Sequence, residues 1–140
     1  MLYVDTGALV ALCTNEDKTA AVVKWYASCV DELASAAWCV TEFGSALGIK
    51  QRTGQLTAAQ AWAAWRQFDR ICANDLQLLP VAAMTFHRAA MLTMDVAAGL
   101  RAGDALHIAC AMEANAHGIV TLDKVMAANA KRFKIRLTPI

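Results

Sequence analysis

Leu2-Tyr3-Val4-Asp5-Thr6-Gly7 begins with a short apolar run typical of a β-strand, followed by a carboxylate and two residues suited to a tight turn. The apolar stretch from Ala8 to Cys13 then favours a helix. The same order of strand, aspartate and helix returns over residues 119–132, around Asp123. Strand candidates alternate with helical segments along the chain, and no Asn-Gly hairpin turn joins two of them. This pattern predicts an α/β fold with a parallel sheet.

The remaining elements follow from the spacing of apolar residues. We expect helices over residues 19–30, 40–52, 57–73, 84–98, 104–116 and 124–132, and strands over residues 33–37, 76–79, 119–122 and 135–138. Gly54, Gly99 and Gly118 stand where the chain would leave a helix. A length of 140 residues and an apolar share of 58% predict a single well-packed domain over residues 1–140.

Composition argues against several classes of protein. A net charge of +1 disfavours a polycation that coats nucleic acid over its whole surface. No apolar run reaches the roughly 18 residues of a membrane span, and the first residues lack the basic start of a signal peptide. We therefore expect a cytoplasmic protein with no membrane partner. The five cysteines are scattered singly, which argues against a disulfide framework or a zinc site, and we expect all five to be buried and reduced.

Four acidic residues fall where a parallel sheet would bring them together. Asp5 and Asp123 each end a strand, whereas Asp104 opens a helix and Glu42 lies in the first turn of another. Ligands of open α/β sheets bind in the crevice beyond the carboxyl ends of the strands, where helices also begin. Neighbouring strands are only about 4.8 Å apart. We therefore expect the first and fourth strands to be adjacent and all four acids to face one cleft.

A simpler interpretation treats three of these residues as helix caps. Asp5, Asp104 and Asp123 each precede a helix, and aspartate is a preferred N-cap; Glu42 could be an exposed residue of a first turn. Capping leaves the shared edge unexplained, whereas convergent carboxylates repel one another unless a cation is present. An all-oxygen site suits Mg²⁺ or Mn²⁺, which can activate water and neutralise charge on a phosphodiester.

Four segments of the chain resemble the motifs of the PIN-domain family. They are residues 3–6 with Leu9, Thr41-Glu42, residues 100–109 and residues 120–123, and the segment around Asp104 is the most specific. The resemblance spans residues 2–137 and is strongest to the VapC-type toxin ribonucleases of toxin–antitoxin pairs. It implies a three-layer α/β/α fold with a five-stranded parallel sheet in the order 3-2-1-4-5.

The resemblance also implies a function and a set of site residues. It implies a Mg²⁺- or Mn²⁺-dependent endoribonuclease, a hydrolase that acts on RNA, forms a homodimer and is inhibited by a cognate antitoxin inserted into the active-site groove. The family's catalytic and metal-binding acids fall on Asp5, Glu42, Asp104 and Asp123, and its supporting hydroxyls on Thr6 and Thr121.

Other functions stay open on the sequence alone. One is a PIN nuclease of RNA processing that has no antitoxin, and another is an RNA-binding protein of this fold that does not cleave. A phosphoacceptor receiver domain is disfavoured, because Asp5 has no acidic neighbour and the strand over residues 76–79 ends in Pro80 rather than an acceptor aspartate.

Several polar residues near these acids allow more than one interpretation. Thr6 and Thr121 could hold Asp5 and Asp123 in place or contact a metal-bound water, or could serve as ordinary capping and strand residues. His107 lies one helical turn after Asp104, so it could orient a carboxylate, contact RNA or simply pack. Arg101 could contact RNA or pair with the acidic cluster.

Aromatic and basic groups are similarly ambiguous. Trp62, Trp65 and Phe68 form an apolar stripe that suits either the core or the surface for a dimer or antitoxin. The basic residues near the end of the sequence could protect an edge strand or bind phosphate; they are Lys131, Arg132, Lys134 and Arg136.

Overall fold

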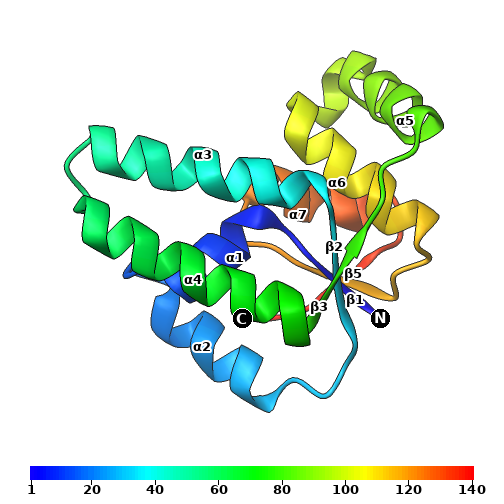
Figure 1. Ribbon diagram of the computed structural model, residues 1–140. Coiled ribbons are helices and arrows are strands. Elements are labelled where there is room, and N and C mark those ends of the chain that lie inside the picture. Colours follow the sequence, from blue (N-terminus) through cyan, green and yellow to red (C-terminus); the bar gives the residue numbers. More distant parts are fainter.

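The computed structural model describes all 140 residues, and its strands and helices alternate along the chain (Figure 1). The strands are β1 (Leu2–Val4), β2 (Leu33–Ala36), β3 (Leu76–Leu79), β4 (Gly118–Val120) and β5 (Arg136–Leu137). The helices are α1 (Thr6–Cys13), α2 (Thr19–Ser28), α3 (Trp38–Arg52), α4 (Ala58–Asn74), α5 (Ala83–Met94), α6 (Ala102–Glu113) and α7 (Lys124–Arg132). A short 3-10 turn, η1 (Val96–Ala98), lies between α5 and α6.

The strands form one parallel sheet in the order β3-β2-β1-β4-β5, which confirms the expected fold class and strand order. β1 is central, and its Leu2 is paired with Leu33 of β2 on one side and Gly118 of β4 on the other. Parallel neighbours need a crossover connection, and every crossover here contains at least one helix. Because β1 and β4 are neighbours, the residues that follow both strands meet at one edge of the sheet.

The sheet is covered on both faces and separates two hydrophobic cores. Successive side chains of a strand point to opposite faces, so Leu2 and Val4 join one core while Tyr3 joins the other. Helices α1 to α4 pack on the first face and α5 to α7 on the second (Figure 1). This is the three-layer α/β/α arrangement that the resemblance implied.

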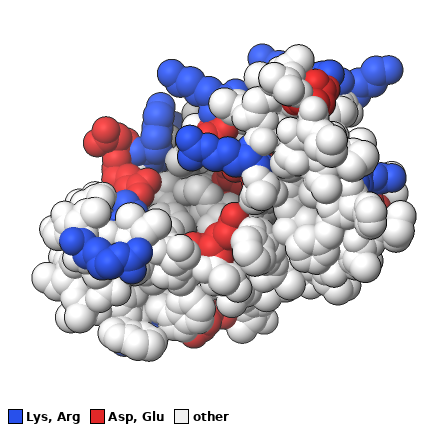
Figure 2. Space-filling view, turned by 90° about the horizontal axis from the view of Figure 1, so that it is seen from above, with Lys and Arg blue, Asp and Glu red and all other residues white.

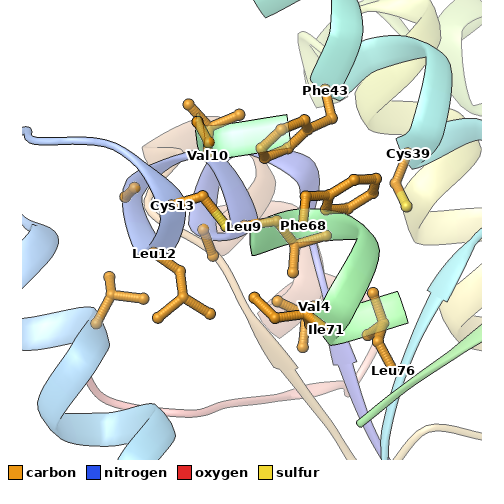
Figure 3. Close-up of a cluster of buried hydrophobic side chains, with 14 of the residues drawn as sticks. Val4, Leu9, Val10, Leu12, Cys13, Cys39, Phe43, Phe68, Ile71 and Leu76 are labelled. Atoms are coloured by element: carbon orange, nitrogen blue, oxygen red, sulfur yellow. The ribbon is translucent and has the colours of Figure 1, made fainter. Parts of the chain in front are cut away.

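The aromatic stripe of α4 divides between core and surface. Phe68 is buried and stacks on Phe43 of α3, with 4.1 Å between the ring centroids (Figure 3). Trp65 is tilted against both of these rings. Trp62, by contrast, is 63% exposed. Core packing therefore accounts for Phe68 and Trp65, and only Trp62 is left for a partner surface.

Several predicted helix ends were wrong by two residues or more, including that of the helix expected over residues 19–30, which ends at Ser28; two of them have clear local reasons. The helix expected over residues 84–98 ends at Met94, because the Asp95 carboxylate accepts a hydrogen bond from the Ala97 amide and starts a separate turn. Gly118 does not follow a helix directly but is the first residue of β4. A Cβ at this position would lie 2.8 Å from Cδ2 of Leu2 and 3.2 Å from the backbone oxygen of Arg136, so a glycine here allows close packing against both neighbouring strands.

The expectations from composition have mixed outcomes. All five cysteines are free, as expected, but only three of them are buried. Cys29 and Cys72 are partly exposed, so the expectation of five buried thiols was wrong for these two. None of the helices is both long enough and apolar enough to cross a membrane.

Candidate metal and active site

The four acids line one cavity of about 470 Å³ at the carboxyl edge of the sheet. Asp5 follows β1 and Asp123 lies beyond the end of β4, whereas Glu42 is supplied by α3 and Asp104 by α6. In the space-filling view, acidic side chains gather in and around a hollow of the surface (Figure 2). The structure therefore brings together the side chains whose shared edge the sequence predicted.

Asp5 caps a helix and lines the cavity at the same time. Its Oδ1 accepts a hydrogen bond from the amide of Ala8 in α1 at 2.7 Å, and its Oδ2 accepts one from the hydroxyl of Thr121. Burial raises the pKa of Asp5 above its usual value, and the negative charge of Asp123 adds to this, against the effect of the two hydrogen bonds. Capping and membership of an acidic site are thus compatible for this residue.

Asp123 and Asp104 differ in how they relate to their helices. Asp123 caps α7 through the amide of Met126, at 2.7 Å. Asp104 is not a cap, since the residue before α6 is Arg101 and Asp104 lies in the first turn without a capping hydrogen bond. The capping alternative is therefore wrong for Asp104. Burial, followed by the charge of Asp123, raises the pKa of Asp104 above its usual value.

Glu42 is held by two donors on one of its oxygens. Its Oε2 lies 2.5 Å from the Thr6 hydroxyl, which donates to it, and 2.6 Å from Nε2 of His107. Burial alone would raise the pKa of Glu42, but the groups that face its carboxylate, His107 first and then Thr6 and Trp38, outweigh burial and hold the pKa below its usual value. Because α3 starts at Trp38, earlier than expected, Glu42 lies in the second turn of the helix rather than the first.

The two supporting hydroxyls have different partners from those the sequence suggested. Thr6 donates to Glu42 and not to its neighbour Asp5. Thr121 donates to Asp5, and its oxygen accepts a hydrogen bond from the backbone amide of Asp123 at 3.0 Å. Each hydroxyl thus fixes an acid from another part of the chain, a relationship that sequence proximity could not reveal.

His107 lines the cavity, and its ring faces the carboxylate of Glu42. It is only 2% exposed, and both ring nitrogens have partners: Nε2 faces Glu42, and Nδ1 lies 2.7 Å from the hydroxyl of Tyr3. Tyr3 was missed in the sequence, where it looked like an ordinary strand residue. Arg101 is exposed at the start of α6 and lies near enough to Asp104 to lower its pKa slightly against the other influences.

Residues 2–132 match the model of the PIN domain family. The chain belongs to the PIN domain family. No curated protein sequence matches it significantly. Among solved structures, it is similar to the Mycobacterium tuberculosis toxin VapC20, which cleaves the sarcin–ricin loop, with 16% identity, a TM-score of 0.74 and coverage of 92% of this chain and 95% of that one.

Two further structures share the fold of this PIN domain at low identity. FitAcB from Neisseria gonorrhoeae is 14% identical with a TM-score of 0.72, covering 99% of this chain and 97% of the other. VapBC2 from Rickettsia felis, bound to a DNA fragment of its promoter, is 15% identical with a TM-score of 0.64, covering 99% and 98%. At such identities these likenesses show the fold alone.

The donor set of this PIN domain fits a hard divalent cation. The four acids offer only oxygen, the donor that Mg²⁺ and Mn²⁺ prefer. As the side chains stand, no three His, Cys, Asp or Glu side chains are close enough to enclose an ion. The raised pKa values of Asp5 and Asp104 reflect burial and the repulsion of neighbouring charges, and a bound cation would relieve that repulsion.

The cavity also contains an ion pair that the sequence analysis missed. Lys50 of α3 is the only lysine or arginine in the cavity lining, and its Nζ lies 2.5 Å from Oε1 of Glu16. Glu16 lies between α1 and α2, so the pair joins two separate segments beside the acids. The basic residues near the end of the sequence do not line the cavity, and one of them, Arg132, pairs with Asp95 at 2.6 Å.

Proposed function

We propose that this PIN domain is a Mg²⁺- or Mn²⁺-dependent endoribonuclease and the toxin of a type II toxin–antitoxin pair. The observation that carries the proposal is the lining of one cavity by Asp5, Glu42, Asp104 and Asp123 in a chain that matches the PIN domain model. A variant of the fold that had lost its nuclease activity would be expected to lack at least one of these acids. The complete set therefore favours cleavage over RNA binding alone.

The residues of the cavity divide into those that would hold a cation and those that would orient them. Asp5, Asp104, Asp123 and the Oε1 atom of Glu42 would hold it, with Thr121 orienting Asp5. A bound divalent ion would lower the pKa of a water molecule and neutralise charge that develops on the phosphate. Without such an ion the acidic cavity would repel the RNA backbone, so the proposed activity depends on the metal.

Lys50 gives the cavity its one group suited to an RNA phosphate. Its ammonium group lies at the cavity lining with only 15% of the side chain exposed, paired with Glu16. A phosphate that enters the cavity would find this cation already in place and would compete with Glu16 for it. We infer that Lys50 contacts the RNA backbone, in place of the contact suggested for His107.

The proposed partners are a second copy of the chain and an antitoxin. The support is the fold shared with toxin–antitoxin structures such as the Rickettsia felis complex, together with exposed apolar side chains such as Trp62. A small antitoxin reading frame immediately upstream of the gene would distinguish a toxin from a PIN nuclease that acts without an antitoxin.

The function is tested by incubating the purified protein with Mn²⁺ and a panel of cellular RNAs and mapping the cleavage sites by sequencing. We expect discrete cuts that chelator removes and that Asp104→Asn abolishes while its circular dichroism stays native. Loss of one carboxylate from such a site typically costs orders of magnitude in rate. Cleavage by folded Asp104→Asn at the wild-type rate would contradict the nuclease proposal.

A further inference from the structure

The Tyr3 hydroxyl is one end of a buried chain of polar contacts that reaches Glu42. Tyr3 is fully buried in the sheet, and its oxygen accepts a hydrogen bond from the Ala36 amide at 2.9 Å. The same oxygen lies 2.7 Å from Nδ1 of His107, whose Nε2 lies 2.6 Å from Oε2 of Glu42. A phenol, an imidazole and a carboxylate thus connect the middle of the sheet to the cavity.

The proton positions in this chain follow from the chemistry of its members. The Glu42 carboxylate can only accept hydrogen bonds, so the facing Nε2 of His107 must carry a proton. The Tyr3 oxygen already accepts from Ala36, and its own buried proton needs an acceptor. The acceptor in hydrogen-bonding position is Nδ1 of His107. These requirements agree on a ring that donates from Nε2 and accepts at Nδ1.

We propose that Tyr3 is a positioning residue that fixes His107 in the Nε2–H tautomer and thereby fixes which oxygen of Glu42 is available to a cation. His107 and Thr6 both donate to Oε2 and occupy its two lone pairs, which leaves Oε1 for the metal. The proposal deepens the proposed function, since it relies on that function for the nature of the site.

The two oxygens of Glu42 have different surroundings. A Cβ on Gly103, at the start of α6, would lie 2.5 Å from Oε1 of Glu42, so the absence of a side chain there lets this oxygen pack against α6, close to the indole nitrogen of Trp38. The hydrogen bonds of Thr6 and His107 thus both go to Oε2 and neither goes to Oε1, which is the arrangement expected for a ligand that binds through a single oxygen.

The tautomer can be observed directly by NMR of the imidazole nitrogens in ¹⁵N-labelled, metal-free protein at neutral pH. We expect the His107 ring to show a proton on Nε2 and none on Nδ1. In Tyr3→Phe we expect this single tautomer to be lost. The matched control is Tyr26→Phe. The Tyr26 hydroxyl donates a hydrogen bond to Asp75, and Tyr26 does not line the cavity. The hydroxyl of Ser35 is buried beside Tyr3 without a hydrogen-bond partner, so it is the competing acceptor for the Tyr3 proton. A ring protonated on Nδ1, or on both nitrogens because Tyr3 donates to Ser35, would overturn the proposal.

The consequence for the site is measured by titrating each variant with Mn²⁺ alone. Loss of a group that orients a metal ligand typically weakens metal affinity 10- to 100-fold, and we expect Tyr3→Phe to lie near about tenfold, since it acts through His107. Tyr26→Phe should bind as wild type does. An unchanged Mn²⁺ affinity in Tyr3→Phe would refute the role of Tyr3.

Two replacements of His107 separate orientation from packing. The amide nitrogen of Gln can take the place of Nε2, whereas that of Asn takes the place of Nδ1 and cannot reach Glu42. We therefore expect His107→Gln to retain most of the Mn²⁺ affinity and His107→Asn to lose it. Equal losses of Mn²⁺ affinity in the two folded variants would contradict the proposal. If His107→Asn does not fold, the Mn²⁺ affinity of Tyr3→Phe decides whether the proposal holds.

Neither measurement depends on RNA, so the two proposals can fail separately. Wild type that binds Mn²⁺ and shows the Nε2–H tautomer but cleaves no RNA would refute the nuclease and leave the positioning role intact. Wild type that cleaves RNA, with Tyr3→Phe unaltered in tautomer and Mn²⁺ affinity, would refute the positioning role alone.

Discussion

The hydroxyl of Thr121, just beyond β4, donates a hydrogen bond to Oδ2 of Asp5, just beyond β1. The two residues are 116 positions apart and meet because their strands are neighbours in the sheet. Oδ1 of Asp5 accepts from the Ala8 amide, so each oxygen has one protein donor and keeps a lone pair for another partner. The sheet topology thus sets the orientation of a carboxylate in the cavity.

Thr121→Val should weaken Mn²⁺ binding by about tenfold or more, as expected for loss of an orienting hydrogen bond. The bond also lowers the pKa of Asp5, so its removal should raise that pKa further. Protons then compete with the metal at higher pH, so the pH below which Mn²⁺ binding is lost should rise. Mn²⁺ titrations from mildly acidic to neutral pH measure both effects.

Thr138→Val is the matched control for Thr121→Val, because the Thr138 hydroxyl is buried without a hydrogen-bond partner. It should bind Mn²⁺ as wild type does at every pH. A Thr121→Val protein whose binding profile coincides with that of this control would show that the hydroxyl does not orient Asp5 for a cation.

Asp104→Asn should stabilise the metal-free protein, because it removes a charge that burial and Asp123 disfavour without removing a helix cap. A pKa raised by folding makes the wild type less stable as pH rises above the ordinary aspartate range, near about pH 4. The gain in melting temperature should therefore be small in acid and largest at neutral pH. Thermal melting in chelator across this range provides the measurement.

Added Mn²⁺ should reverse the order of the two melting temperatures, so that the wild type melts above Asp104→Asn. The ion stabilises the folded wild type by binding to it, whereas the variant has lost a ligand. Equal shifts of both melting curves on addition of Mn²⁺ would argue that Asp104 does not bind the cation.

The sequence predicted the sheet and the acids well because strand ends and helix starts converge at one edge of any parallel α/β sheet. Asp5 and Asp123 followed directly from this rule. The sequence could not predict which hydroxyl donates a hydrogen bond to which carboxylate. Thr6 lies beside Glu42, and Thr121 beside Asp5, only in the folded arrangement of the strands and helices. Tyr3 was missed for the same reason.

Local chemistry accounts for the smaller errors. Asp104 resembled a cap because the apolar helical pattern begins directly after it, yet α6 begins at Ala102, so the Asp104 carboxylate makes no capping hydrogen bond. Lys50 and Glu16 looked like ordinary surface charges in the sequence, and their pairing beside the acids depends on how α3 packs against the segment between α1 and α2.

Gly103→Ala should displace Glu42 and lower both Mn²⁺ affinity and RNA cleavage, because the added Cβ would lie 2.5 Å from Oε1. Alanine also favours helix by up to about 1 kcal/mol over glycine, so the fold should persist. Gly48→Ala is the helical control, since its Cβ would meet only the mobile end of Arg52, at 3.2 Å. Wild-type Mn²⁺ affinity in Gly103→Ala would mean that Oε1 needs no free space.

Phe68→Ala should destabilise the protein by about 3–5 kcal/mol, since it leaves a cavity in the stack with Phe43. Trp62→Ala, at an exposed position of the same helix, should change stability by less than about 0.5 kcal/mol. Urea unfolding of both variants tests this division of the aromatic stripe. Comparable losses would show that Trp62 is buried in solution, for example between two copies of the chain.

Lys50→Gln should weaken RNA binding, measured by fluorescence anisotropy of a labelled oligonucleotide in an Asp104→Asn background that does not cleave. Each phosphate neutralised on a single strand contributes about 0.7 to the slope of log affinity against log salt. Loss of Lys50 should reduce the slope by roughly this amount. Glu16→Gln should have the opposite effect on affinity, because it releases Lys50 from its ion pair and leaves one negative charge fewer beside the RNA.

Lys24→Gln serves as the control for Lys50→Gln, because Lys24 is an exposed lysine of α2 that does not line the cavity. It removes the same charge from the protein, so it reports the general loss of electrostatic attraction at a distance. A salt slope that falls equally in the two lysine variants would attribute the effect to net charge. A slope that falls only in Lys50→Gln assigns the phosphate contact to Lys50, because the two variants lose the same charge and differ in whether that charge lay in the cavity lining.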